Sequence, residues 1–250
     1  KITPVYYKRL PNADTIFKIM KMTGTDDQYN LISHWMPTQM LVTESTLDQA
    51  FLEINNLMSE TGIIPFDYET YDPLKHRPFN EAMPATQKAK GDYVDVLSSE
   101  IAGASFTFGS NLQHTYYFSV AHKDTDNLSK SVIADIINEV IEQGKPLCVH
   151  NASFEEQVTK QCLDILIPEP WDTRIMASYV DENEESGLKS ISQRVFHYEQ
   201  ETYSQVMEKA GAADMRDVTG EQVLSYGCDD AFVSGHLAHL FYITMKLENT

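Results

Sequence analysis

Cysteine, cationic side chains and long apolar segments are all scarce in this sequence of 250 residues. The three cysteines, Cys148, Cys162 and Cys228, are too few and too widely spaced for a disulfide framework or a zinc ribbon. They favour buried thiols in a reducing compartment. No apolar run approaches the ~20 residues that a membrane-spanning helix needs, and no signal peptide opens the sequence. We therefore expect a cytoplasmic protein without a membrane partner.

Positive charge is the second deficit. Lys and Arg number 19 against 37 Asp and Glu, which leaves a net charge of −18. This balance disfavours a broad basic face that binds nucleic-acid phosphates directly. It still allows a protein that contacts a strand through bound divalent cations, because carboxylates are ligands that hard cations prefer. Nucleotide-cofactor folds and serine hydrolases have no support, since neither a glycine-rich phosphate loop nor a Gly-x-Ser-x-Gly motif is present.

The spacing of the apolar residues predicts strands and helices in alternation. Residues 1–39 have no clean period and are predicted to form an N-terminal extension, with a single domain at 40–250. Strands are predicted at 40–43, 63–67, 101–108, 115–120 and 146–150, and helices at 46–59, 152–163 and 220–247, with shorter ones around 132–140, 175–179 and 188–195. A hairpin followed by alternating helices and strands indicates an α/β fold, a mixed sheet with helices on its faces.

The first candidate site is the pair Asp67 and Glu69, predicted to lie where the buried strand 63–67 ends. Residues two apart in a strand point to the same face, so the two carboxylates converge. They repel each other unless a cation lies between them. The alternative is a pair of acids that merely face solvent in an acidic chain.

A second candidate follows the strand at 146–150, in the segment from His150 to Glu155. A helix is predicted to begin here, with Glu155 in its first turn. Helix capping is the competing interpretation, with Asn151 as the N-cap and Glu155 favouring the positive end of the helix.

The third candidate is the pair Tyr226 and Asp230 on the last helix. The two residues are one turn apart and share a face. A phenol beside a carboxylate can orient a metal-bound water. Chance is the competing explanation, because the sequence contains 13 tyrosines.

In their order along the chain these motifs resemble those of the DEDDy 3′–5′ exonucleases, the proofreading domains of family A DNA polymerases and their stand-alone relatives. The resemblance covers about 40–247. Most members have Asp where this sequence has Glu155, and the His-Asn-Ala-x-Phe-Glu form is similar to that of bacteriophage polymerases. The segments that carry the resemblance are Phe66-Asp67-Tyr68-Glu69-Thr70, His150-Asn151-Ala152-Ser153-Phe154-Glu155, Trp171-Asp172-Thr173-Arg174, Ser186-Gly187-Leu188-Lys189-Ser190-Ile191 and Tyr226-x-x-x-Asp230.

The resemblance implies an RNase H-like fold and phosphodiester hydrolysis with two divalent ions, Mg²⁺ or Mn²⁺. It places Asp67 between both ions, and Glu69 and Asp230 at the ion that activates water. Tyr226 would orient that water, and Glu155 would serve the second ion, beside the departing 3′ oxygen.

Substrate contacts and partners are also implied by the resemblance. Thr70 and Asn151 flank the acids and are expected to bind the terminal nucleotide. Phe154 would stack on a base, although a place in the core explains it equally well. The implied substrate is the single-stranded 3′ end of DNA. A polymerase domain is expected to follow Thr250, and a phage-encoded protein would work in the host cytoplasm.

Two other functions stay open at this point. One is a stand-alone nuclease similar to RNase D, acting on RNA or on repair intermediates. The other is a catalytically silent module that binds nucleic acid or a protein partner, for which the departure at Glu155 leaves room.

Overall fold

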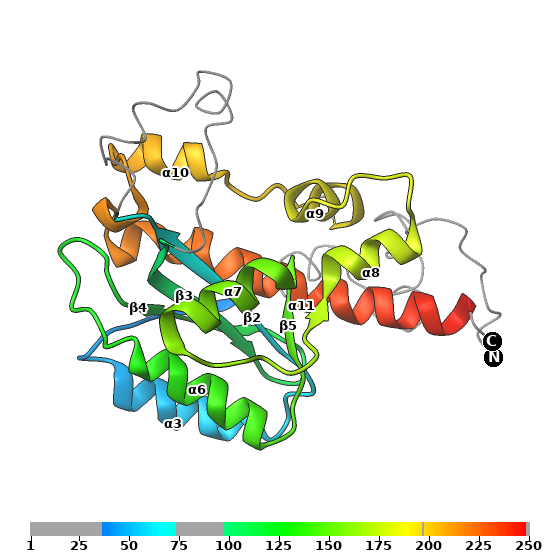
Figure 1. The fold of residues 1–250 in the computed structure, drawn as a ribbon, viewed down its shortest axis with the longest axis horizontal. Coiled ribbons are helices and arrows are strands. Elements are labelled where there is room, and N and C mark those ends of the chain that lie inside the picture. The colour runs from blue at the N-terminus through cyan, green and yellow to red at the C-terminus, as the bar shows by residue number, and fades with distance from the viewer. Residues whose placement is uncertain (1–36, 74–97, 197, 249–250) are drawn as a thin grey trace.

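The computed structural model describes residues 37–73, 98–196 and 198–248, drawn as ribbons in Figure 1. Their strands form one six-stranded mixed sheet in the order β1-β4-β3-β2-β5-β6. The strands are β1 (Thr38–Val42), β2 (Ile64–Tyr71), β3 (Glu100–Phe108), β4 (His114–Ser119), β5 (Leu147–Val149) and β6 (Trp171–Asp172). The helices are α3 (Leu47–Met58), α6 (Ser131–Glu142), α7 (Ala152–Leu163), α8 (Thr173–Val180), α9 (Leu188–Phe196), α10 (Tyr203–Ala210) and α11 (Gly220–Glu248), with the 3-10 turn η1 (Met215–Asp217).

Strand β2 lies near the middle of the sheet and connects its two halves. It pairs antiparallel with β3, which pairs antiparallel with β4, while β1 adds to β4 in parallel. On the other side β5 pairs in parallel with β2, and β6 with β5. This mixed sheet with helices on its faces is the predicted α/β architecture, and it is consistent with the RNase H-like exonuclease fold.

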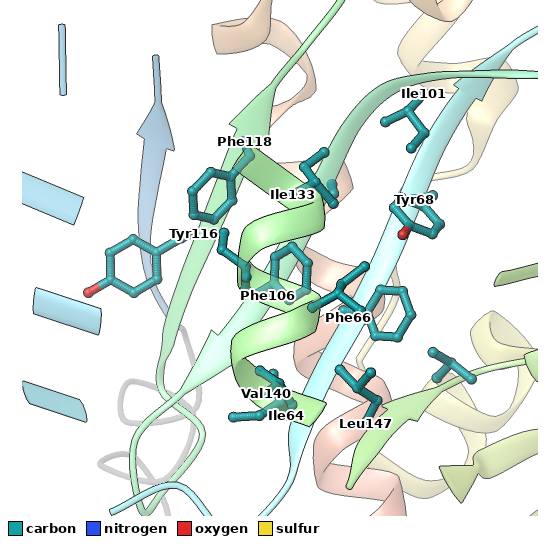
Figure 2. Close-up of a cluster of buried hydrophobic side chains, with 14 of the residues drawn as sticks. Ile64, Phe66, Tyr68, Ile101, Phe106, Tyr116, Phe118, Ile133, Val140 and Leu147 are labelled. Atoms are coloured by element: carbon teal, nitrogen blue, oxygen red, sulfur yellow. The ribbon is translucent and has the colours of Figure 1, made fainter. Parts of the chain in front are cut away.

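Alternation along β2 sends one set of side chains into an apolar core. Ile64, Phe66 and Tyr68 are buried in a cluster with residues of β3, β4, α3, α6 and α7. Figure 2 shows Phe66 and Phe106 among these side chains, and their rings are stacked with centroids 5.6 Å apart. Since side chains in a strand alternate in direction, Pro65, Asp67 and Glu69 are left to the opposite face.

The opposite face is covered by α11, the long helix that Figure 1 draws in red and orange. Two glycines allow this helix to approach the strands closely. A Cβ on Gly227 would lie 2.4 Å from the ring of Tyr117, and one on Gly235 would lie 2.4 Å from Cγ of Pro65. Neither distance is possible for a real Cβ, so both positions require glycine unless α11 moves away from the sheet.

Helix α11 is apolar on more than one side because it has two sets of neighbours. Near its start, Val223 and Cys228 pack with β3, β4 and α10. Further along, Phe232 and Leu237 pack with residues of α8 and α9. The part of the chain that the structure describes has no helix long and apolar enough to cross a membrane.

Most predicted elements are present with small shifts, but one strand is longer than predicted, and β6, α10 and η1 were not predicted. The predicted end of the second strand at Asp67 is wrong, because β2 pairs with β3 as far as Tyr71. Helix α10 was not predicted, although a capping box formed by Thr202 and Gln205 marks its start. Residues 1–36 of the predicted extension and 74–97 of the long polar segment lie outside the described residues.

Candidate active site

Asp67 and Glu69 lie within β2, on the sheet face that α11 covers. Tyr68, between them, points the other way, and its hydroxyl is 2.9 Å from Oγ1 of Thr159 on α7. A β-bulge follows directly after Glu69, and the residue opposite Glu69 on β3 is Gly103, which has no side chain. Bulges of this kind redirect side chains and are common beside active sites. The two carboxylates therefore share one face, as the sequence predicted.

The environment of both acids favours their protonated forms. Glu69 is 7% exposed, whereas Asp67 keeps partial contact with solvent although protein surrounds it. Burial raises the pKa of Asp67 well above its usual value, and the negative charge of Asp230 raises it further. Burial and the charge of Asp67 do the same to the pKa of Glu69. Buried carboxyl groups with such raised pKa values, close to other negative charges, ionise fully only when a cation neutralises them.

Asp230 reaches this cluster from α11, one turn after Tyr226. Its Oδ1 accepts a hydrogen bond of 2.6 Å from Nε2 of Gln200 and lies 3.7 Å from Nζ of Lys189. Burial raises the pKa of Asp230, while the Lys189 charge and the Gln200 hydrogen bond act in the opposite direction. The Lys189 ammonium also lies 4.5 Å from the centre of the Tyr226 ring.

Glu155 comes from a third element, the first turn of α7. It is 3% exposed, and among the described residues no hydrogen-bond donor reaches its Oε2. Burial raises the pKa of Glu155 well above its usual value, and the charge of Asp67 adds to the effect. A buried carboxylate oxygen without a partner is costly. A bound cation would satisfy it.

Asp172 anchors the helix that carries Glu155. Asn151 occupies the N-cap position of α7, as in the competing capping interpretation, but its side chain does not cap the helix. Asn151 has a left-handed backbone (φ 84°) and makes no side-chain cap; its Oδ1 accepts from Arg174 Nη1 at 3.1 Å. Asp172 instead accepts the backbone N–H groups of Asn151 at 3.1 Å and Ala152 at 2.9 Å. The same carboxylate caps α8 by accepting from the backbone of Arg174 at 2.8 Å and Ile175 at 3.3 Å.

The three residues predicted to contact the substrate differ in burial and in what their side chains contact. Thr70 follows the bulge on β2 and is partly buried. Asn151 lies at the start of α7 with its side chain held by Arg174. Phe154 is partly buried and packs against the main core, which favours the packing role that the sequence left open for it.

Sequence reasoning missed Lys189 and Gln200 as neighbours of the acids. Lys189 was noted only within a stretch of family resemblance, and nothing in its local pattern showed where its ammonium would lie. Gln200 lies in the segment before α10 without any periodic signal. Both meet Asp230 because α9 and the segment after it fold against α11.

The donor set suits a hard divalent cation, because all four acids offer carboxylate oxygens. In residues 37–73, 98–196 and 198–248, no three His, Cys, Asp or Glu side chains lie close enough together to hold a metal as they stand. Asp230 is engaged with Lys189 and Gln200 instead. By donor type the four carboxylates fit a hard divalent cation, and the unpartnered oxygen of Glu155 supports this fit.

The sequence from 91 to 247 matches the model of the 3′–5′ exonuclease family, and the chain belongs to this family. The matched residues include Glu155, Tyr226 and Asp230. Asp67 and Glu69 precede the matched segment. The electrostatic influence of Asp230 on both acids supports placing them in the same site.

Solved structures share the fold at low sequence identity. NrnC of Brucella melitensis superposes with a TM-score of 0.53 at 11% identity, over 78% of each chain, and a second NrnC structure contains bound pGG. The POL domain of Pol1 from M. smegmatis, in complex with DNA primer-template and dNTP, superposes with a TM-score of 0.52 at 11% identity. That match covers 84% of this chain but 28% of the polymerase chain. A search of curated proteins found no match.

Proposed function

We propose that this 3′–5′ exonuclease hydrolyses DNA from a single-stranded 3′ end with two divalent ions, as the proofreading domain of a DNA polymerase. The observation that carries the proposal is the electrostatic coupling of acids from three separate elements, β2, α7 and α11. Burial raises the pKa values of Asp67, Glu69 and Glu155, the negative charge of Asp230 raises all three further, and Oε2 of Glu155 has no partner. The exonuclease domain would comprise 40–250, with 1–39 as an extension.

Asp67, Glu69 and Asp230 would hold one ion, and Asp67 and Glu155 the second. When bound, the ions supply Lewis-acid stabilisation to the attacking and leaving oxygens of the phosphodiester. Tyr226 would orient the attacking water. Burial and the charge of Glu69 raise the pKa of Tyr226, so its phenol stays neutral and can donate a hydrogen bond.

The terminal nucleotide would lie between β2 and the start of α7. Thr70 would contact it from the β2 side. Asn151, whose side chain accepts a hydrogen bond from Arg174, would contact it from the α7 side. Phe154 is the weaker candidate for stacking on a base because it packs against the core. Since the chain is strongly acidic, we infer that duplex binding is left to another domain.

A stand-alone nuclease that acts on RNA or short oligonucleotides is the second candidate function. The observation that favours it is the NrnC superposition, which covers 78% of both chains, so the shared fold makes up most of each chain. The structure with pGG makes a dinucleotide a suitable test substrate.

Single-stranded DNA labelled at its 5′ end tests the proposal, with Mg²⁺ or Mn²⁺ and with EDTA as the blank. The matched variants are Asp67→Asn, within the cluster, and Asp135→Asn, on the exposed side of α6. We expect a ladder of shortened products that disappears with EDTA and with Asp67→Asn but persists with Asp135→Asn.

Two further substrates separate the candidate functions. An RNA strand of the same sequence and pGG are assayed beside the DNA. Faster cleavage of RNA or pGG would favour the stand-alone nuclease. Immediate release of the labelled mononucleotide would contradict 3′–5′ polarity. No cleavage of any substrate with either metal would favour the silent module.

A further inference from the structure

Lys189 places a positive charge inside the acidic cluster. Its Nζ lies 3.7 Å from Oδ1 of Asp230 and 4.5 Å from the centre of the Tyr226 ring. The same ammonium donates a hydrogen bond of 2.5 Å to the backbone carbonyl of Glu201. Lys189 thus joins α9 to α11 and to the segment that leads into α10. Its side chain remains 34% exposed, so it lies at the accessible side of the cluster.

The influence of this charge extends beyond Asp230. It opposes the rise in pKa of both Asp67 and Glu69, the two acids of β2. Within the described ranges, the other ion pairs join acids outside the cluster, such as Lys160 with Asp164 on the surface of α7. Lys189 is therefore placed to act as the counter-charge of the acids when no metal is bound.

We propose that Lys189 is a resident counter-ion that holds the carboxylate cluster together without metal and competes with a divalent ion for Asp230. The inference rests on the proposed function, because it concerns the same acids. An ammonium and a divalent ion repel each other, and both would use the carboxylate of Asp230, so a bound ion would drive Lys189 away from this side chain.

The surroundings of Lys189 allow its ammonium to leave Asp230 and still keep favourable contacts. The carbonyl of Glu201 and the face of the Tyr226 ring both contact the ammonium and neither is a proposed metal ligand. Cation–π contacts and hydrogen bonds to a backbone carbonyl remain favourable when the ion pair is lost. Partial exposure also lets water take the place of Asp230.

Removing the charge of Lys189 should therefore have opposite effects on the free and the metal-bound protein. Lys189→Met keeps the apolar stem and deletes the ammonium. We expect Mn²⁺ to bind roughly 3- to 30-fold more tightly to this variant, the range expected for one partly screened charge. In EDTA its Tm should fall below that of the wild type, and saturating Mn²⁺ should narrow this difference.

Calorimetric titration with Mn²⁺ and thermal unfolding test this without reference to activity. Lys160→Met is the matched control, because it removes an equal charge from an exposed ion pair on α7, and it should leave the affinity within about twofold of the wild type. Lys189→Arg should likewise stay close to the wild type because the charge is kept. If Lys189→Met does not fold, Lys189→Gln is measured in its place.

The outcomes separate the two proposals. Tighter binding by the Lys189 variants but not by Lys160→Met supports the counter-ion. Equal or weaker binding by Lys189→Met or Lys189→Gln overturns it while leaving the metal-dependent function intact. A wild type that binds no Mn²⁺ refutes the proposed two-metal function and the counter-ion together.

Discussion

Replacing Gly227 by alanine should push α11 away from the sheet and move Tyr226 and Asp230 out of place. The new Cβ would lie 2.4 Å from the ring of Tyr117, well inside any real contact distance. The ring cannot turn aside easily. It is fully buried, and its hydroxyl is 2.7 Å from Nε2 of His122.

Because the ring is held, the helix has to move by about 1 Å to restore van der Waals contact. Overpacking of this kind costs roughly 1–3 kcal/mol, which corresponds to a decrease in Tm of about 2–12 °C for a chain of this size. Displacing catalytic groups by about 1 Å can lower kcat by up to ~100-fold. We therefore expect Gly227→Ala to lose activity more strongly than its modest loss of stability explains.

The assay compares Tm and kcat on single-stranded DNA for Gly227→Ala and Gly62→Ala. Gly62 is the matched control, because a Cβ there would meet nothing within 4 Å. Gly62→Ala should behave like the wild type. If Gly227→Ala also keeps wild-type Tm and kcat, then the close contact of α11 with Tyr117 does not position the site.

Three further predictions concern the acids and their supports. Asp172→Ala removes the acceptor of four backbone N–H groups at the starts of α7 and α8. We expect the free energy of unfolding, measured in urea, to fall by about 1–4 kcal/mol and Mn²⁺ binding to weaken. An unchanged unfolding midpoint would contradict the anchoring role. Glu155→Gln removes a buried charge, so the variant should be more stable than the wild type in EDTA. It should also bind the second ion poorly, with kcat reduced at least ~100-fold. A wild-type kcat would exclude Glu155 from the reaction. Burial raises the pKa of Asp229 to about 6 from an ordinary value of 3.8, so protonation of Asp229 stabilises the folded state. This stabilisation is complete below about pH 4 and is lost as the pH rises through 6. The pKa values of Asp67, Glu69 and Glu155 are raised as well, whereas burial lowers those of His122, His150 and His236 to about 4, which stabilises the fold as the pH rises. The test is therefore a comparison in EDTA: the Tm of Asp229→Asn relative to the wild type should rise from pH 4 to 7, and a constant difference would refute the assignment.

Local patterns in the sequence were sufficient for most elements of the fold. The alternation in β2 predicted that Asp67 and Glu69 share a face, because side chains in a strand alternate in direction whatever the strand pairs with. Helical spacing in the same way placed Tyr226 and Asp230 together on α11. The predicted strand end at Asp67 was wrong because β2 is prolonged by its pairing with β3, which local polarity does not indicate.

The contacts around the acids depend on how distant segments pack, and no local period encodes them. Asp172 reaches the start of α7 because β6 pairs beside β5. Lys189 meets Asp230 because α9 folds against α11, whose approach to the sheet depends on small residues such as Gly227. Periodicity thus placed the candidate acids on shared faces of a strand and a helix. Long-range packing sets the partners and charges that each of them meets, because these contacts join segments far apart in the chain.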